Sequence, residues 1–350
     1  MKLGNSIVDM AEQDPNQPRQ PKDMEGLLKF CMQATKSEDA SGSGTQDPID
    51  PEKLEWLQEA MKNMTVDVVQ QLAEGIRILS QPYVYDVNAT DEELEEATEA
   101  FEAISDWVGN IDMANNFHKI GGFVILKRII KSSPHSELRW NAANTVAELS
   151  QNNPYCQEHF VTDGFIQALI EMLKNGLEDE QIVSENCSLK SLYAISSIVR
   201  DYPPGLETFL ALNGSEVVLQ CAIQPQTATQ RLRTKACFFV SSISLESKEA
   251  ANTFSDMGLA RQLIVLLQQV EHQQADEHVV KALLTLLRND KNAQRECRDS
   301  SELNLDGLID TRKKDLEGKE EFQEELEHYL EIESLCYGPD KSQSDSEVNR

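Results

Sequence analysis

The chain has 350 residues and a formal net charge of −28, which comes from 60 acids and 32 bases. Hydrophobic residues make up 40% of it, which suffices for a large core and excludes a wholly disordered chain. The acidic balance argues against binding to nucleic acids or anionic membranes, because lysine and arginine side chains supply most of that affinity.

The acidic charge is unevenly distributed along the chain. Residues 84–112 contain 10 acids and no base. Residues 113–288 contain 15 bases and 18 acids, so this long middle segment is nearly neutral. We therefore expect a binding surface for a charged partner in the middle segment, where local electrostatics differ from the average.

The N-terminal segment 1–50 is predicted to be mostly disordered, because it is polar and rich in proline, serine and glycine. A short apolar island at 24–34 interrupts it and carries Leu27, Leu28 and Phe30. On its residues alone, this island is either a linear motif for a partner's groove or a helical turn docked on the domain. Apolar residues at three- and four-residue spacing predict N-terminal helices over 51–112, including an acidic amphipathic helix over 90–110.

The middle of the chain is repetitive. Gly121, Gly164, Gly214 and Gly258 follow one another at intervals of 43, 50 and 44 residues, each before a similar apolar helical pattern. This period predicts an all-α fold, a right-handed armadillo-like solenoid of about four repeats over 113–300 with flanking helices. Asn289 interrupts the apolar column of the last repeat, which favours an end repeat. Acidic helices over 301–336 and a disordered tail over 337–350 are expected to follow.

Sequence signals for chemistry or targeting are missing. The seven cysteines contain no CxxC pair and are predicted to be reduced core thiols. No metal-ligand spacing, phosphate-binding loop or nucleophile motif is present, so we predict a protein that is not an enzyme. The N-terminus resembles no signal peptide, which favours the cytoplasm and also allows the nucleus.

A ladder of polar and aromatic side chains recurs on the last helix of each repeat, which lines the concave face of armadillo-type stacks. It forms a basic stripe with interleaved aromatic rings, and charge complementarity predicts an acidic protein partner. The candidate partner-binding residues are Arg139, Asn141, Asn144, Lys190, Tyr193, Arg233, Lys235, Phe238 and Lys281.

Several local motifs resemble the armadillo-type nucleotide exchange factors of the seventy-kilodalton heat-shock chaperones. They lie at Gly26–Phe30, Trp56–Met61, Asn110–Asn115, Ser150–Asn153, Ala194–Arg200 and Phe322–Glu327. The resemblance implies a co-chaperone whose concave face binds the chaperone's ATPase domain and accelerates ADP release, without a metal or cofactor. It also implies that Leu27, Leu28 and Phe30 form a release motif that aids client release, with Phe30 where several relatives carry tryptophan.

A second function class is an armadillo scaffold that binds an extended peptide or another acidic protein. Such scaffolds use ordered asparagine and tryptophan ladders across many repeats. Here Asn141 and Asn144 have no counterparts in the next repeats and Trp140 stands alone. The exchange-factor interpretation is therefore preferred.

Overall fold

The computed structural model describes residues 67–178, 185–223, 229–269 and 276–338. Secondary structure in these ranges is entirely helical, which confirms the all-α prediction for them. None of the described helices combines the length and apolar character needed to span a membrane. The predicted motif residues Leu27, Leu28 and Phe30 lie outside the described residues.

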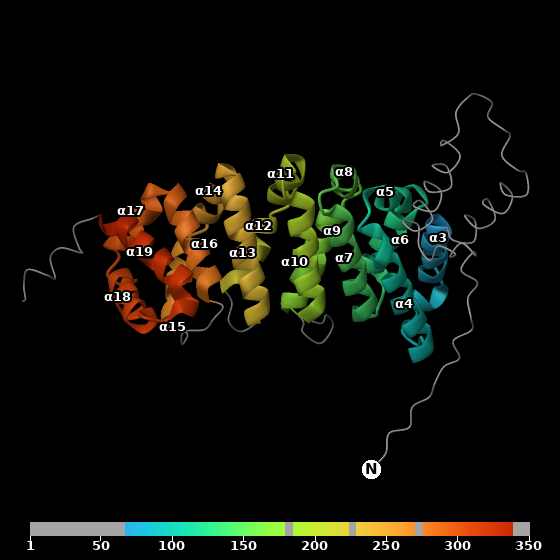
Figure 1. Cartoon of the computed structure of the whole chain (residues 1–350), viewed down its shortest axis with the longest axis horizontal. Helices are drawn as coiled ribbons and strands as arrows, with labels where there is room; N and C mark the ends of the chain where they lie inside the picture. The colour runs from blue at the N-terminus through green and yellow to red at the C-terminus, as the bar shows by residue number, and fades with distance from the viewer. Residues whose placement is uncertain (1–66, 179–184, 224–228, 270–275, 339–350) are drawn as a thin grey trace, which may run out of the picture. The chain divides into compact units, whose positions relative to one another are not determined.

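Most of the described chain consists of three-helix units that follow one another (Figure 1). The first helices are α5 (Ile111–Lys119), α8 (Pro154–Thr162), α11 (Pro203–Ala211), α14 (Lys248–Asp256) and α17 (Lys291–Asp299). The second helices are α6 (Gly122–Ser132), α9 (Phe165–Glu178), α12 (Gly214–Ile223), α15 (Leu259–Gln269) and α18 (Leu305–Leu316). The third helices are α7 (Ser136–Ser150), α10 (Glu185–Val199), α13 (Gln230–Glu246), α16 (Asp276–Asn289) and α19 (Gln323–Tyr337), with the short η2 (Glu320–Phe322) just before α19.

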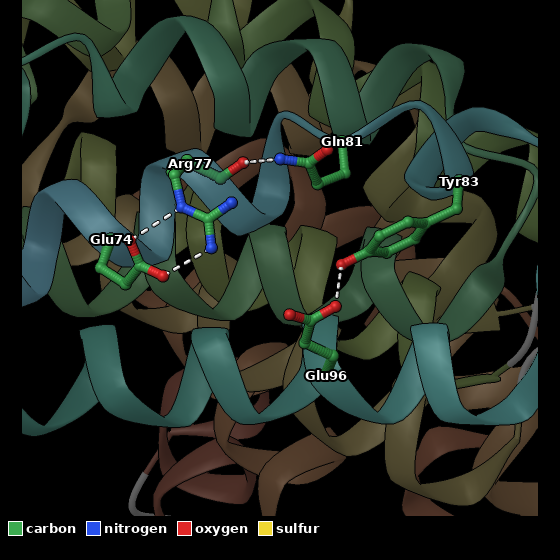
Figure 2. Close-up of polar contacts among 5 residues, drawn as sticks. All are labelled: Glu74, Arg77, Gln81, Tyr83 and Glu96. Carbon is green, nitrogen blue, oxygen red and sulfur yellow. Dashed lines mark hydrogen bonds and ion pairs between the residues drawn. The ribbon is translucent and has the colours of Figure 1, made fainter.

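Three elements precede the first unit: α3 (Val68–Leu79), η1 (Pro82–Tyr85) and α4 (Asp91–Val108). Thr90 and Glu93 form a capping box that fixes the start of α4 close to the predicted position. Figure 2 shows how η1 is tied to α4, where the Tyr83 hydroxyl donates a 2.8 Å hydrogen bond to Glu96. Because α4 packs against α7, it extends the row of third helices at the N-terminal end.

Polar caps explain why the first helix of most units begins where it does. Asn110, Asn153, Ser247 and Asp290 each accept hydrogen bonds from the first backbone N–H groups of α5, α8, α14 and α17. The third unit differs, because α11 begins with Pro203 after Tyr202, which makes no side-chain cap.

The turn between the first and second helices requires a left-handed residue, and this corrects the predicted register of the third unit. Gly121, Gly164 and Gly258 have φ of +93°, +71° and +70°, but the equivalent residue in the third unit is Asn213 with φ of +55°. Gly214 instead begins α12, where a Cβ atom would lie 2.2 Å from the Phe209 ring. The predicted alignment is therefore wrong by one residue in this unit.

Burial agrees with the corrected register. One residue earlier than predicted, Val218 and Cys221 are both fully buried, as are Leu126 and Leu169 at the position equivalent to Val218. Leu219, which the predicted alignment placed at this position, is 9% exposed. The six described cysteines are all buried, in agreement with their prediction as core residues.

The C-terminal helices continue the three-helix pattern, although we expected acidic helices that only flank the repeats. Helix α18 packs against α15, and α19 packs against both α16 and α18, as in the earlier units. Asn304 supplies the left-handed residue with φ of +40°. Asn289 is exposed and donates to the carbonyl oxygen of Thr285 at 2.9 Å. It does not mark an end repeat, because α19 packs on α16 and continues the stack.

Candidate partner-binding face

The exposed sides of α4, α7, α10, α13, α16 and α19 form one continuous surface, which we call the third-helix face. These helices lie side by side in chain order, because each packs against the next (Figure 1). The predicted site residues lie on α7 (Arg139, Asn141, Asn144), α10 (Lys190, Tyr193), α13 (Arg233, Lys235, Phe238) and α16 (Lys281). The structure brings some of them together and places others in the interior.

Asn144, Lys190, Tyr193 and Lys235 form a central cluster that joins three successive third helices. The Lys190 amine donates a 2.7 Å hydrogen bond to Asn144 Oδ1. The amines of Lys190 and Lys235 lie 5.8 and 6.0 Å from the centroid of the Tyr193 ring. Both distances allow cation–π attraction, so the aromatic ring holds two like charges close to one another.

Glu148 of α7 links this cluster to the preceding helix α4. Its two carboxylate oxygens accept hydrogen bonds from Asn144 Nδ2 at 2.7 Å and from Ser105 Oγ of α4 at 2.8 Å. Gln151 also donates to the Tyr193 hydroxyl. A chain of hydrogen bonds therefore runs from α4 through α7 to α10 and fixes the orientation of Lys190.

Electrostatics around Lys190 are unfavourable for its charge. Burial lowers the pKa of the Lys190 amine, the nearby cations of Lys235 and Arg231 lower it further, and only Glu148 opposes the change. Burial also raises the pKa of the Tyr193 hydroxyl, with the Glu148 carboxylate adding to the effect. A half-buried lysine close to a second cation is costly in the free protein, and a partner's carboxylate would relieve that cost.

Three of the predicted binding residues have side chains that are buried, half-buried or already hydrogen-bonded within the protein. Asn141 is buried with 9% exposure, and Arg139 Nε donates a 3.2 Å hydrogen bond to the Ile130 carbonyl oxygen of α6. Arg233 is half-buried, and its Nε atom is enclosed without a hydrogen-bond acceptor. For Asn141 the reason is side-chain length: Lys190 occupies the same ladder position, but its four-carbon stem carries the amine outward.

The basic stripe ends earlier than predicted. Lys281 lies 3.2 Å from the Glu324 carboxylate and Arg288 lies 2.6 Å from Glu331, so both cations are paired with α19. More carboxylates surround them on the same end of the face, at Glu277, Glu320, Glu321 and Glu327. The C-terminal end of the third-helix face is therefore acidic, because the last unit contributes a third helix that the repeat alignment did not include.

Two exposed apolar residues of α13 complete the centre of the face. Phe238 is 47% exposed, and Arg200 and His278 lie against its ring at 6.0 and 6.1 Å. Leu245, two helical turns further along α13, is 62% exposed. Sequence reasoning missed Leu245, Arg200 and Glu148, although the seven-residue spacing from Phe238 to Leu245 puts both on one side of α13.

This arrangement can bind a protein surface that carries carboxylates beside an apolar patch. Interfaces derive most of their affinity from a few central aromatic, apolar and arginine side chains, with charges controlling orientation and association rate. The third-helix face offers such a centre between α7 and α13. Its two ends, α4 and α19, are acidic and would repel the same carboxylates.

Comparison with solved structures identifies the fold. A designed armadillo repeat protein aligns with 76% of this chain and 99% of its own, with a TM-score of 0.55 at 14% identity. A computationally designed armadillo repeat protein for modular peptide recognition aligns with 75% of this chain and 99% of its own, with a TM-score of 0.56 at 15% identity. These similarities concern the fold alone and confirm an armadillo-like solenoid.

Sequence comparison identifies the family. A family model described as nucleotide exchange factor Fes1 matches residues 24–117, and one for the SIL1/FES1/HPBP1 C-terminal domain matches residues 113–261. Hsp70-binding protein 1 of Homo sapiens is 30% identical over 95% of this chain and 89% of its own length. The protein of that name from Mus musculus is 31% identical over 95% of this chain and 90% of its own. The chain therefore belongs to the family of Hsp70-binding protein 1 and the nucleotide exchange factor Fes1.

Proposed function

We propose that this protein is a co-chaperone that binds the ATPase domain of an Hsp70 chaperone through the third-helix face and accelerates ADP release. The observation that carries the proposal is the similarity to Hsp70-binding protein 1 over 95% of the chain. The central cluster supports it, because two amines held against Tyr193 suit carboxylates on a partner.

The mechanism is one of linked equilibria and requires no bond to be made or broken by this chain. An ATPase domain that holds ADP between its lobes exchanges between closed and open arrangements. A partner that binds the open arrangement more tightly raises its population by the ratio of the two affinities. Each tenfold increase in the open population requires about 1.4 kcal/mol of difference in binding free energy.

The rigidity of the third-helix face determines how much its affinity can differ between the open and closed arrangements of the chaperone. The hydrogen bonds from Ser105 through Glu148 and Asn144 to Lys190 order the face before the partner arrives. A pre-ordered surface loses little side-chain entropy on binding. Its shape can therefore select one arrangement of the lobes instead of adapting to both.

The experiment is a stopped-flow measurement of labelled ADP leaving Hsp70. The variant carrying Lys190→Glu with Lys235→Glu should accelerate release much less than the wild type. Its two new carboxylates would repel the carboxylates that we expect on the partner. The matched control changes Lys248→Glu with Lys291→Glu, which are exposed lysines at the starts of α14 and α17. Equal acceleration by a folded central-cluster variant and by this control would refute the assignment of the face.

The proposal includes the N-terminal motif as a second, separable element. Leu27, Leu28 and Phe30 would compete with a client for the peptide groove of the chaperone. Leu27→Ala with Phe30→Ala should leave ADP release nearly intact and slow the release of a labelled client peptide. Identical client release by this variant and the wild type would reject the motif without affecting the exchange proposal.

The peptide-scaffold alternative receives less support. Asn144 is occupied by Lys190 and Glu148, and Asn141 is buried, so neither amide is free to hold a peptide backbone. Capture of an extended peptide with no affinity for the Hsp70 ATPase domain would reverse this ranking.

A further inference from the structure

We propose that the outward side of α6 is a second binding surface, which recognises an acidic polypeptide segment carrying an apolar side chain. The surface, called the α6 patch, consists of Val124, Lys127, Arg128 and Lys131. It is separate from the third-helix face, so the inference goes beyond the exchange function.

The α6 patch is one continuous stripe along the helix. Its members follow at intervals of three and four residues, which places them on the same side of α6. The opposite side is buried through Leu126, Ile129 and Ile130 in the core that α6 shares with α7. The patch therefore faces away from α7 and from the row of third helices.

Exposed apolar surface lies at the N-terminal end of the patch. Val124 is 70% exposed, and Ile120, at the C-terminal end of α5 just before the turn into α6, is 36% exposed. Beside Val124 is an open hollow of about 610 Å³, which is lined by the three basic side chains and has the buried rings of Phe123 and Phe165 beneath it. A hollow with an apolar floor and a cationic rim suits an apolar side chain flanked by carboxylates.

Two of the three cations are held by groups other than carboxylates. Lys127 donates to the backbone carbonyl oxygen of Asp163, and the Arg128 guanidinium lies 4.0 Å above the Tyr85 ring. Over the described part of the chain, none of these three side chains forms an ion pair. Among the residues that line the hollow, the side chain of Asp163 is the single carboxylate, so the rim keeps a net positive charge.

The observations favour an acidic polypeptide over a nucleic acid or a membrane. The patch offers three cations on a chain whose net charge is −28, and a long phosphate backbone needs many more cationic contacts than that. An anionic bilayer would likewise meet a surface that is acidic on average. A short acidic segment fits inside the patch, and its apolar side chain accounts for the exposure of Val124.

The test uses fluorescence anisotropy with a labelled peptide that has a central leucine flanked by glutamates. The full-length protein should bind this peptide at low ionic strength and lose affinity as salt is added. A peptide with glutamines in place of the glutamates should bind at least about tenfold more weakly, since charge pairs at a partly dry rim supply the selectivity. Lys127→Glu with Lys131→Glu should weaken the acidic peptide to a similar degree.

Additional variants separate recognition from folding. Lys131→Glu alone changes an exposed side chain and should reduce affinity without altering the thermal unfolding temperature. Val124→Ser should reduce affinity for the leucine peptide and leave a glutamate-only peptide unaffected. Acceleration of ADP release from Hsp70 should be unchanged in the patch variants, which distinguishes this surface from the third-helix face.

Three results would overturn the proposal. The first is equal affinity for the glutamate and glutamine peptides, and the second is unchanged binding by the Lys127→Glu, Lys131→Glu variant. The third is displacement of the peptide by single-stranded DNA or phosphatidylserine vesicles that bind more tightly than the peptide, which would assign the patch to a phosphate-bearing ligand.

Discussion

Lys190 is predicted to contribute to partner binding but hardly at all to stability. The substitution that separates these roles is Lys190→Met, which keeps most of the apolar stem and removes the amine. The amine is half-buried, donates to Asn144 Oδ1 at 2.7 Å and lies 5.8 Å from the Tyr193 ring.

Two opposing contributions determine the effect on folding. A hydrogen bond from a charged donor contributes about 1.5–3 kcal/mol, which Lys190→Met would remove. Burial of the amine and its closeness to Lys235 and Arg231 oppose this, and the lowered pKa of Lys190 shows that they outweigh the attraction of Glu148. We therefore expect the free energy of unfolding at neutral pH to change by no more than about 1 kcal/mol.

The same balance predicts a pH dependence. Because the pKa of Lys190 is lower in the folded protein, the unfolded chain binds more protons at alkaline pH. Stability contributed at this position should rise as pH increases through the folded pKa toward the ordinary lysine value of about 10.4. Lys190→Met should remove that rise.

The assay combines urea unfolding of wild type and Lys190→Met with labelled-ADP release from Hsp70. We expect nearly equal unfolding free energies and a clear loss of exchange acceleration. Destabilisation by more than about 2 kcal/mol would refute the reasoning, because it would make Lys190 a structural residue. Full exchange activity in the variant would show that the amine does not contact the chaperone.

Three further changes test other parts of the structure. Phe238→Ser should weaken Hsp70 binding by about 1–3 kcal/mol in titration calorimetry, since half-exposed rings at interface centres dominate affinity, while the unfolding temperature barely changes. His118 stacks on His159 at 4.0 Å, and burial and His159 lower its pKa, so stability should fall as pH drops below about 6.5. In thermal melts, His118→Phe should reduce that loss, and an unchanged pH profile would contradict the role of the pair. Gly214→Ala should destabilise the fold by about 1–3 kcal/mol in urea titrations, because its Cβ would lie 2.2 Å from the Phe209 ring; a neutral effect would contradict the corrected register.

Helix periodicity was sufficient to predict α4 and the repeating units, because it reflects burial of one helix side in every unit. The one-residue error in the third unit arose where Asn213 replaces glycine in the left-handed turn. Asparagine tolerates this backbone conformation better than most residues. An alignment anchored on glycine therefore chose Gly214, whose own constraint is contact with Phe209.

The fifth unit escaped prediction because polar residues occupy its core positions. Arg312 is 6% exposed and donates a 2.8 Å hydrogen bond to the Leu267 carbonyl oxygen, at a place equivalent to buried apolar residues in earlier units. Its guanidinium also lies 3.8 Å from the Asp276 carboxylate. Glu325, 1% exposed, occupies the position that holds Ala282 in the preceding unit. Apolar periodicity cannot detect a unit in which charged residues occupy buried positions.

The site illustrates a different limit of sequence reasoning. The ladder predicted correctly that Lys190, Lys235 and Tyr193 are neighbours, because identical positions of successive repeats stack on one another. It could not predict that Asn141 is buried, which depends on side-chain length. Nor could it predict that Lys281 is neutralised by Glu324, which depends on packing against a helix outside the alignment.

These corrections change how the charge of the third-helix face is expected to act. A uniform basic stripe over all repeats would let an acidic partner slide from one unit to the next with little change in energy. The observed face is basic from α7 to α13 and bounded by acids, eight on α4 and several more around α16 and α19. Carboxylates on a partner are attracted to the centre and repelled at both ends, so one register is favoured over its neighbours. The proposed exchange function is served by a single register, because a partner shifts an equilibrium only by binding one arrangement better than the other.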